Sequence, residues 1–174
     1  FILMSANGAK KTGTKYQSTK YKSEEYLKES GLKWTIFRPS LIFGDSGDKI
    51  EFNKQLKQDL ISVPFPAPLF YKGLLPVNAG KFKMSPIHVK DVSKIFIKSL
   101  SMDETIGNIY KLGGEEKTWK EILKLISKVS GKNKFFLPVP VLPVKLLAFL
   151  FDRFSWFPIS KDQLAMLLEG NICD

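Results

Sequence analysis

Residues 5–44 read SANGAKKTGTKYQSTKYKSEEYLKESGLKWTIFRPSLIFG, and they follow a short apolar run, FILM. An apolar run that ends in small, turn-forming residues is typical of a buried parallel strand reaching the edge of its sheet. Residues 33–37 form a second run, rich in aromatic and β-branched side chains, and a helical segment separates the two runs. This pattern predicts a βαβ unit, with Ser5 at the carboxyl end of the first strand, where open α/β sheets bind their ligands.

Tyr16 and Lys20 stand four residues apart in the helical segment, so both side chains leave the same face of the helix. A Lys ammonium near a Tyr hydroxyl favours the phenolate and lowers the pKa of the phenol toward the neutral range. The spacing alone is weak evidence of a site, because 25 of the 27 basic residues in this chain are Lys. A solvated helix face is the alternative interpretation.

Ordered motifs along the whole chain resemble those of the short-chain dehydrogenase/reductase superfamily, in its extended or atypical branch of NAD-dependent epimerases and dehydratases. The motifs are Ser5 ahead of Tyr16-Gln17-Ser18-Thr19-Lys20, then Arg38-Pro39-Ser40-Leu41-Ile42-Phe43-Gly44, Pro86-Ile87-His88-Val89-Lys90-Asp91-Val92 and Tyr110-Lys111-Leu112-Gly113-Gly114. Within this branch, SANGA, WTIFRPSLIFG and SKDQLAMLLEGN are similar to the subgroup of the NADPH-binding accessory subunit of respiratory complex I and its bacterial relatives.

The resemblance implies an α/β fold, namely the carboxyl-terminal half of a Rossmann-type doubly wound parallel sheet with a small, mainly helical module. We expect residues 1–45 and 82–113 to belong to the NAD(P)-binding domain, and residues 46–81 and 114–174 to form a smaller region that binds substrate or a partner. The chain begins at Phe1 and contains no GxGxxG motif, so we expect the amino-terminal half of the parent protein, with its phosphate-binding turn, to be missing. The fragment by itself is expected to be inactive.

The resemblance also assigns roles to individual residues. Ser5 would orient a substrate hydroxyl or carbonyl, Tyr16 would exchange its proton, and Lys20 would lower the pKa of Tyr16 and hold the nicotinamide ribose. The expected cofactor is NAD or NADP, with NADP favoured by the subgroup, and the cofactor-binding residues would be Tyr16, Lys20, Pro39 and Ser40. A small carbonyl, hydroxyl or nucleotide-sugar substrate would contact Leu41, Asn53 and His88.

The charge pattern argues against a nucleic-acid partner. The formal net charge is +10, but the lysines are interleaved with acidic residues along the chain, as on a solvated surface. One His and one Cys predict neither a metal cluster nor an internal disulfide. We expect a reducing compartment and a cytoplasmic protein, or one bound peripherally at the inner membrane. Arg38, one of two Arg residues, would form a structural salt bridge or contact the ligand.

Several segments predict local structure. Residues 63–76 are rich in Pro and aromatic residues and form either a lid or a packed loop. Asp91 is predicted to cap a helix that buries Leu100 among other apolar residues, and His88 just before it is either hydrogen-bonded or part of the site. Thr118 with Glu121, and Ser160 with Gln163, are capping boxes at the starts of two further helices.

Residues 135–157, FFLPVPVLPVKLLAFLFDRFSWF, are strongly apolar but are interrupted by Pro and charged residues short of the ~20 that a spanning helix needs. Three interpretations remain for the apolar run 146–151: burial in the smaller region, docking on a protein partner, and shallow insertion at a membrane surface.

Two functions are compatible with these motifs. The first is a nicotinamide-dependent oxidoreductase or epimerase that uses the Ser-Tyr-Lys site. The second is a non-catalytic protein that binds NADPH as a structural element and docks on a membrane respiratory complex. The motifs are shared by both, because one fold supports many functions.

Overall fold

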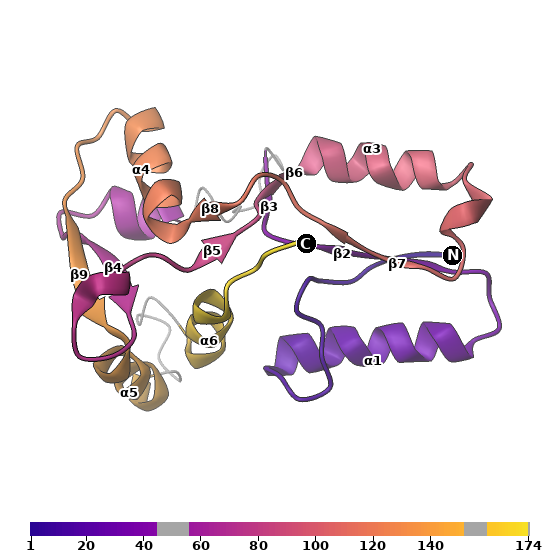
Figure 1. The fold of residues 1–174 in the computed structure, drawn as a ribbon, viewed down its shortest axis with the longest axis horizontal. Helices are drawn as coiled ribbons and strands as arrows, with labels where there is room; N and C mark the ends of the chain where they lie inside the picture. The colour runs from indigo at the N-terminus through magenta and orange to yellow at the C-terminus, as the bar shows by residue number, and fades with distance from the viewer. Residues whose placement is uncertain (45–55, 152–159, 174) are drawn as a thin grey trace. The chain divides into compact units, whose positions relative to one another are not determined.

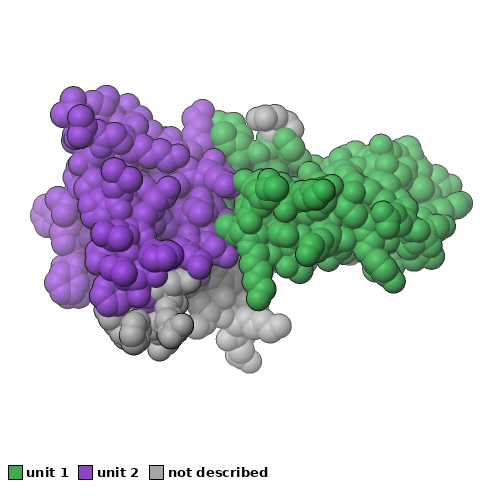
Figure 2. All heavy atoms as spheres, turned by 90° about the horizontal axis from the view of Figure 1, so that it is seen from below, with its two compact units in different colours: residues 1–45, 85–116, 171–174 green, residues 46–84, 117–170 purple. Residues whose placement is uncertain are grey.

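The computed structural model describes residues 1–44, 56–151 and 160–173. The chain divides into two compact units, coloured separately in Figure 2. Unit 1 comprises residues 1–45, 85–116 and 171–174, and unit 2 comprises residues 46–84 and 117–170.

Unit 1 is built on a parallel sheet of three strands in the order β1-β2-β7. The strands are β1 (Ile2–Met4), β2 (Thr35–Pro39) and β7 (Ile109–Leu112). Helices α1 (Lys15–Glu29) and α3 (Val89–Ser99) cover opposite faces of this sheet (Figure 1). The parallel strands and the helix on each face confirm the predicted α/β class.

The predicted βαβ unit is β1, α1 and β2, with β1 and β2 paired in parallel. A capping box at Thr14 and Gln17 starts α1, and Gly31 follows its last turn with a φ of 74° that suits glycine. Strand β2 begins two residues later than predicted. Its first three side chains, Thr35, Ile36 and Phe37, are buried, whereas Lys33 is exposed, because only the buried stretch has sheet neighbours on both sides.

Helix α3 begins at Val89, so the predicted cap at Asp91 is wrong. The cap is His88, whose Nδ1 accepts a hydrogen bond from the backbone N–H of Lys90 at 3.2 Å. The short strand β6 (Ile87–His88) pairs in parallel with β3 (Ile42–Phe43), which fixes His88 in this position. The helix ends at Ser99 and leaves Leu100 76% exposed, in contrast to the predicted burial.

The glycines after β7 have a packing role. A Cβ on Gly113 would lie 2.7 Å from the Cβ atoms of Ser85 and Cys173, and a Cβ on Gly114 would collide with the backbone carbonyl of Pro86. The chain after β7 therefore passes too close to its neighbours in unit 1 for any side chain, which explains this pair of glycines in physical terms.

Unit 2 contains two small sheets and most of the remaining helices. Strand β4 (Ala67–Tyr71) pairs in parallel with β9 (Phe136–Pro140), and β5 (Lys83–Met84) pairs antiparallel with β8 (Lys117–Thr118). The described helices of unit 2 are η1 (Lys57–Ile61), η2 (Pro76–Asn78), α4 (Trp119–Val129), α5 (Val141–Phe151) and α6 (Lys161–Glu169), while the short η3 (Asp103–Thr105) belongs to unit 1.

The Pro-rich segment 63–76 was predicted to be a loop, but its centre is strand β4. Pro68 in β4 lies opposite Leu137, and Pro138 in β9 lies opposite Leu69. Each strand has one sheet neighbour among the described residues, so a Pro without an N–H can face the open side of the ladder. Both strands were missed in the sequence because Pro within an apolar run counts against a strand.

Both predicted capping boxes are confirmed. Thr118 with Glu121 starts α4, and Ser160 with Gln163 starts α6. The first residue of α4, Trp119, is 1% exposed, and its indole N–H donates to the carbonyl of Pro68 at 2.9 Å. Ala148, Leu164 and other apolar residues form a core between α5 and α6.

Helix α5 is apolar on most sides but is poorly buried. Only Val141 and Ala148 of this helix are buried. Its exposed large apolar side chains are Leu142, Leu146, Leu147, Phe149 and Leu150. Burial of the whole run 146–151, the first of the three interpretations, is therefore wrong for most of its side chains. In the part of the chain that the structure describes, no helix has the length and apolar character needed to cross a membrane.

Replacement of Gly114 by Ala should lower the free energy of unfolding by about 1–3 kcal/mol, because the added Cβ collides with a backbone carbonyl that cannot rotate away. Urea unfolding followed by circular dichroism measures this loss. Gly107→Asn is the matched control: a Cβ at Gly107 meets nothing within 4 Å, and Asn tolerates its φ of 77°. Equal effects of the two substitutions would contradict the packing explanation.

Candidate functional site

Ser5, at the end of β1, belongs to a buried polar cluster. Its hydroxyl donates a short hydrogen bond to Oε1 of Glu24 on α1, and both side chains are buried. Arg38 on β2 donates to the same carboxylate, from Nε to Oε1 at 2.9 Å and from Nη2 to Oε2 at 2.5 Å. Since all of the polar atoms in this cluster have partners, the Ser5 hydroxyl is engaged within the protein.

Arg38 resolves one of the alternatives left open by the sequence. Its guanidinium forms a two-pronged salt bridge with the fully buried Glu24, and the hydrogen bonds that it donates to that carboxylate raise the pKa of Arg38 above its ordinary value. The structural salt bridge is therefore the observed role. The sequence analysis missed Glu24. A salt bridge for Arg38 calls for an acidic partner, and the acids of α1 were candidates for it.

Tyr16 and Lys20 lie on one face of α1, as their spacing predicted. The Lys20 Nζ lies 5.8 Å from the centroid of the Tyr16 ring and donates a 3.3 Å hydrogen bond to the carbonyl of Met4, at the end of β1. The Tyr16 side chain is half exposed, and its partial burial raises the pKa of the phenol above 10.0. This direction is opposite to the shift that Lys20 was expected to produce.

Pro39 and Ser40 follow directly at the end of β2 and are buried. The Ser40 hydroxyl donates to the carbonyl of Asn171 at 2.8 Å. The same carbonyl accepts the backbone N–H of Ser85, so residues 171–173 are held against the carboxyl edge of the unit 1 sheet. Leu41, the next residue, is partly buried.

Asn7 is a polar residue of this edge that the sequence analysis did not single out. It lies two residues beyond Ser5, and its backbone N–H donates to the carbonyl of Pro39. Its side-chain amide donates to Oδ1 of Asn171 and to the carbonyl of Ile172, each at 2.7 Å. Asn7 and Asn171 are 164 residues apart in the chain, and local patterns do not reveal pairs so distant in sequence.

The other predicted substrate-contact residues are His88 and Asn53, and no contact of either with Tyr16 is observed in the described part of the chain. His88 caps α3, and its ring packs edge-on against Phe43 with 5.2 Å between centroids. Asn53 lies outside the described residues. Among the residues that the structure describes, no group of three or more His, Cys, Asp or Glu side chains could hold a metal ion.

The carboxyl edge of the unit 1 sheet thus offers a limited set of chemical groups. Tyr16 supplies a hydroxyl and Lys20 a cation close to it. The neighbouring hydroxyls of Ser5 and Ser40 are already bonded inside the protein. At this edge Tyr16 and Lys20 lie on one face of α1, while the Ser5 hydroxyl donates to Glu24. The catalytic role of Ser5, Tyr16 and Lys20 stays a prediction.

Two curated relatives are named as mitochondrial subunits of NADH-ubiquinone oxidoreductase or NADH dehydrogenase [ubiquinone]. The chain is 28% identical over 142 residues to the mitochondrial NADH-ubiquinone oxidoreductase 40 kDa subunit of Neurospora crassa, covering 80% of this chain and 34% of the relative. It is 29% identical over 134 residues to the mitochondrial NADH dehydrogenase [ubiquinone] 1 alpha subcomplex subunit 9 of Dictyostelium discoideum, covering 75% and 34%. The chain thus spans about a third of the length of these relatives. No family model matches it.

Solved structures with the same fold are nucleotide-sugar enzymes. UDP-glucose 4-epimerase of Thermus thermophilus in complex with NAD gives a TM-score of 0.58 at 20% identity, covering 94% of this chain and 62% of that one. The dTDP-4-dehydrorhamnose reductase of Bacillus anthracis in complex with NADP gives 0.59 at 18% identity, covering 80% and 50%. These likenesses confirm the predicted Rossmann-type fold.

Replacement of Glu24 by Gln should lower the free energy of unfolding by about 3–5 kcal/mol, because Arg38 is left without its counter-charge. Urea unfolding with an unchanged m-value measures the loss. Glu25→Gln is the matched control on the same helix, since Glu25 pairs with Lys28 on the exposed surface and should leave stability unchanged. If both variants unfold at the same urea concentration, the buried cluster does not hold the βαβ unit together.

Proposed function

We propose that the chain belongs to the extended branch of the short-chain dehydrogenase/reductase family and is part of a nicotinamide-dinucleotide-binding protein that serves as a non-catalytic subunit or assembly component of a membrane-bound respiratory complex. In this proposal unit 1 belongs to the nucleotide-binding domain, and unit 2 contacts the partner.

The observation that carries the proposal is the hydrogen bond from Ser5 to Glu24. A catalytic Ser must direct its hydroxyl at the substrate oxygen, within hydrogen-bond reach of the Tyr that exchanges the proton. Here the hydroxyl donates instead to a buried carboxylate that also neutralises Arg38. Turning it toward a substrate would break a hydrogen bond to a charged acceptor, at a cost of about 1.5–3 kcal/mol. Ser5 is better suited to holding β1 against α1.

Tyr16 supports the same proposal. A general base must be ionised when it accepts a proton, and partial burial raises the pKa of Tyr16 instead of lowering it toward the neutral range. The Lys20 ammonium, which would stabilise the phenolate, is engaged by the carbonyl of Met4. Tyr16 and Lys20 remain suitable as hydrogen-bond donors to a bound ligand.

A nicotinamide dinucleotide fits this edge in part. Tyr16 and Lys20 would hold the ribose next to the nicotinamide, with Pro39 and Ser40 beneath the ring, and a dinucleotide bound in a catalytic site would supply the hydride. The 174 residues contain no GxGxxG turn for the pyrophosphate, so these residues would provide one half of the binding site. NADP is the preferred dinucleotide, because of the subgroup resemblance.

The membrane complex as partner is supported by unit 2. Both relatives compared above are described as subunits of NADH-ubiquinone oxidoreductase, or NADH dehydrogenase [ubiquinone]. Helix α5 exposes Leu142, Leu146 and Phe149 to an extent that is unusual for helices of a monomeric protein. The exposed face of α5 would pack on the partner, and the protein would then lie at the periphery of an inner membrane.

An oxidoreductase or epimerase is the second candidate. The specific observation in its favour is the pairing of Tyr16 and Lys20 on one face of α1, beside the carboxyl end of β1. Its substrate would be a small carbonyl or hydroxyl compound or a nucleotide sugar, with Leu41, Asn53 and His88 as candidate contacts. Bound cofactor would have to reorient Ser5 and lower the pKa of Tyr16.

Purified full-length protein should release a nicotinamide dinucleotide on denaturation, identified by mass spectrometry, and should not turn over carbonyl or nucleotide-sugar substrates. Tyr16→Phe should weaken dinucleotide binding by about tenfold, because one hydrogen bond is lost. Tyr26→Phe is the control, since Tyr26 lies on the same helix and is 80% exposed. Isothermal titration of protein stripped of nucleotide measures both.

Turnover by the natural protein that Tyr16→Phe abolishes and Tyr26→Phe preserves would establish the oxidoreductase instead. Absence of any bound or bindable dinucleotide would overturn both candidates.

A further inference from the structure

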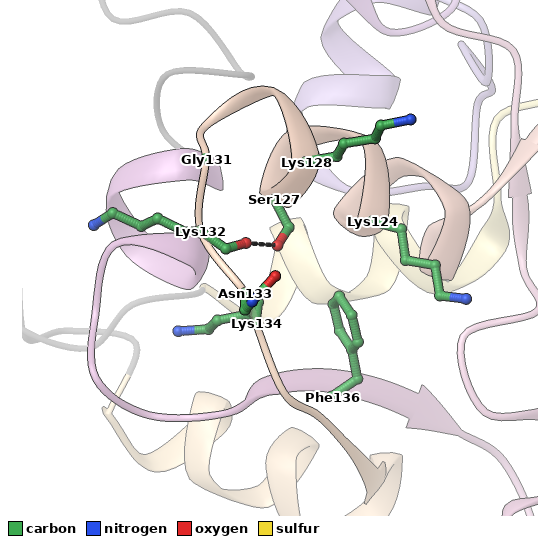
Figure 3. A pocket seen from close by; sticks show the side chains of 8 residues that line it. All are labelled: Lys124, Ser127, Lys128, Gly131, Lys132, Asn133, Lys134 and Phe136. Carbon is green, nitrogen blue, oxygen red and sulfur yellow. Dashed lines mark hydrogen bonds between the residues drawn. The ribbon is translucent and has the colours of Figure 1, made fainter.

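An open hollow of about 430 Å³ lies in unit 2 where α4 ends and the chain turns toward β9 (Figure 3). We call it the cationic hollow. Its lining residues are Lys124, Ser127, Lys128, Gly131, Lys132, Asn133, Lys134 and Phe136. The Ser127 hydroxyl donates to the carbonyl of Lys132, which fixes the turn that follows the helix. The hydrogen-bonded turn after α4 therefore forms part of the hollow, and four lysines line it.

The lysines are arranged around the rim of the cationic hollow. Figure 3 shows the amino groups of Lys124 and Lys128 directed to one side and those of Lys132 and Lys134 to the other. They do not converge on one point, as the ligands of a single phosphate would. Four cations spread around a hollow match a surface that carries many separate negative charges.

Lys134 lies close enough to other positive charge to be affected by repulsion. Its ammonium donates to the carbonyl of Val63 at 2.5 Å. Partial desolvation and the nearby charge of Lys132 lower its pKa below the ordinary value for Lys. None of the described residues that line the cationic hollow is acidic, so an external anion would relieve this repulsion.

A second hollow of about 330 Å³ adjoins the first and shares Lys132, Asn133 and Lys134 with it. We call it the apolar hollow, because its other lining residues are Ile61, Ser62, Val63, Pro64, Phe65, Pro66 and Phe135. Phe65 and Phe135 are 72% and 83% exposed. Exposed aromatic side chains of this size mark an interaction surface. A partner that fits it offers apolar groups to the two rings and negative charges to the neighbouring lysines.

We propose that unit 2 binds the surface of an anionic phospholipid bilayer through a lysine–phenylalanine patch. The patch consists of Lys124, Lys128, Lys132, Lys134, Phe65 and Phe135. Lipid phosphates lie around the ammonium groups, and the two rings enter the interface between headgroups and acyl chains. The patch lies mainly outside the segment 135–157 that the sequence marked for membrane contact, and its action does not depend on whether the protein is catalytic.

Two other partners fit the patch less well. A protein interface is depleted of Lys, which is strongly hydrated and loses rotamer freedom when it is buried. Single-stranded nucleic acid would use lysines and aromatic rings, but it gains nothing from exposed aliphatic side chains. Val63, which lines the apolar hollow and is partly exposed, is such a side chain. Aliphatic groups beside lysines favour lipid.

Flotation of the full-length protein with vesicles tests the proposal. Vesicles of phosphatidylglycerol and phosphatidylcholine in equal parts should bind the protein at least about tenfold more tightly than phosphatidylcholine alone, and added salt should weaken binding. The triple variant Lys124→Gln, Lys128→Gln, Lys132→Gln should lose this preference. Its control is Lys22→Gln, Lys33→Gln, Lys98→Gln, which removes the same charge from exposed positions of unit 1.

Insertion of the rings has its own readout. Because the chain already has three Trp residues, the emission added by each new indole is the difference from the natural protein. On addition of the anionic vesicles this difference should shift to shorter wavelength for Phe135→Trp and not for Leu32→Trp, an exposed site in unit 1. Unchanged thermal midpoints of the variants show that they are folded. Equal binding to neutral vesicles, an equal loss in both triple variants, or no shift for Phe135→Trp would overturn the proposal.

Competition for vesicle binding distinguishes the bilayer from two other anionic ligands. Displacement by inorganic phosphate at low concentration would indicate a site for a single free anion, and displacement by a single-stranded oligonucleotide would indicate nucleic acid; either result contradicts the bilayer proposal. Failure of vesicle binding leaves the dinucleotide measurements unaffected, so the two proposals are tested separately.

Discussion

The carboxylate of Glu24 is fully buried in unit 1 and accepts hydrogen bonds from both Ser5 and Arg38. These three residues come from β1, α1 and β2, so one charge links the three elements of the βαβ unit. A buried charge is tolerated only when it is paired and fully hydrogen-bonded, and this requirement fixes how α1 sits on the sheet. The position of Tyr16 and Lys20 on the exposed part of α1 depends on that placement.

The same interaction bears on the proposed function, because the Ser5 hydroxyl donates to Glu24 in this structure. Tyr16 and Lys20 lie on one face of α1, and partial burial raises the pKa of the Tyr16 phenol. One fold supports many functions, so a fold shared with NAD- and NADP-bound enzymes does not by itself make these residues catalytic.

Local patterns in the sequence predicted a large part of the fold. The capping boxes at Thr118 and Ser160 start helices where expected, because a cap depends on residues within one turn of each other. Strand β4 was missed, since Pro68 counts against a strand unless it is known to face an open side of the sheet. Asp91 was assigned as a cap on residue type, whereas pairing of β6 with β3 makes His88 the cap.

The order of motifs by itself determined the α/β class, and the i, i+4 spacing placed Tyr16 beside Lys20, because helical periodicity is a local property. Only the tertiary structure decided what each polar group contacts. Ser5 and Glu24 are 19 residues apart, and Asn7 and Asn171 are 164 apart. Hydrogen bonds over such separations follow from how strands and helices pack, and packing also left the lysines of unit 2 beside exposed Phe65 and Phe135.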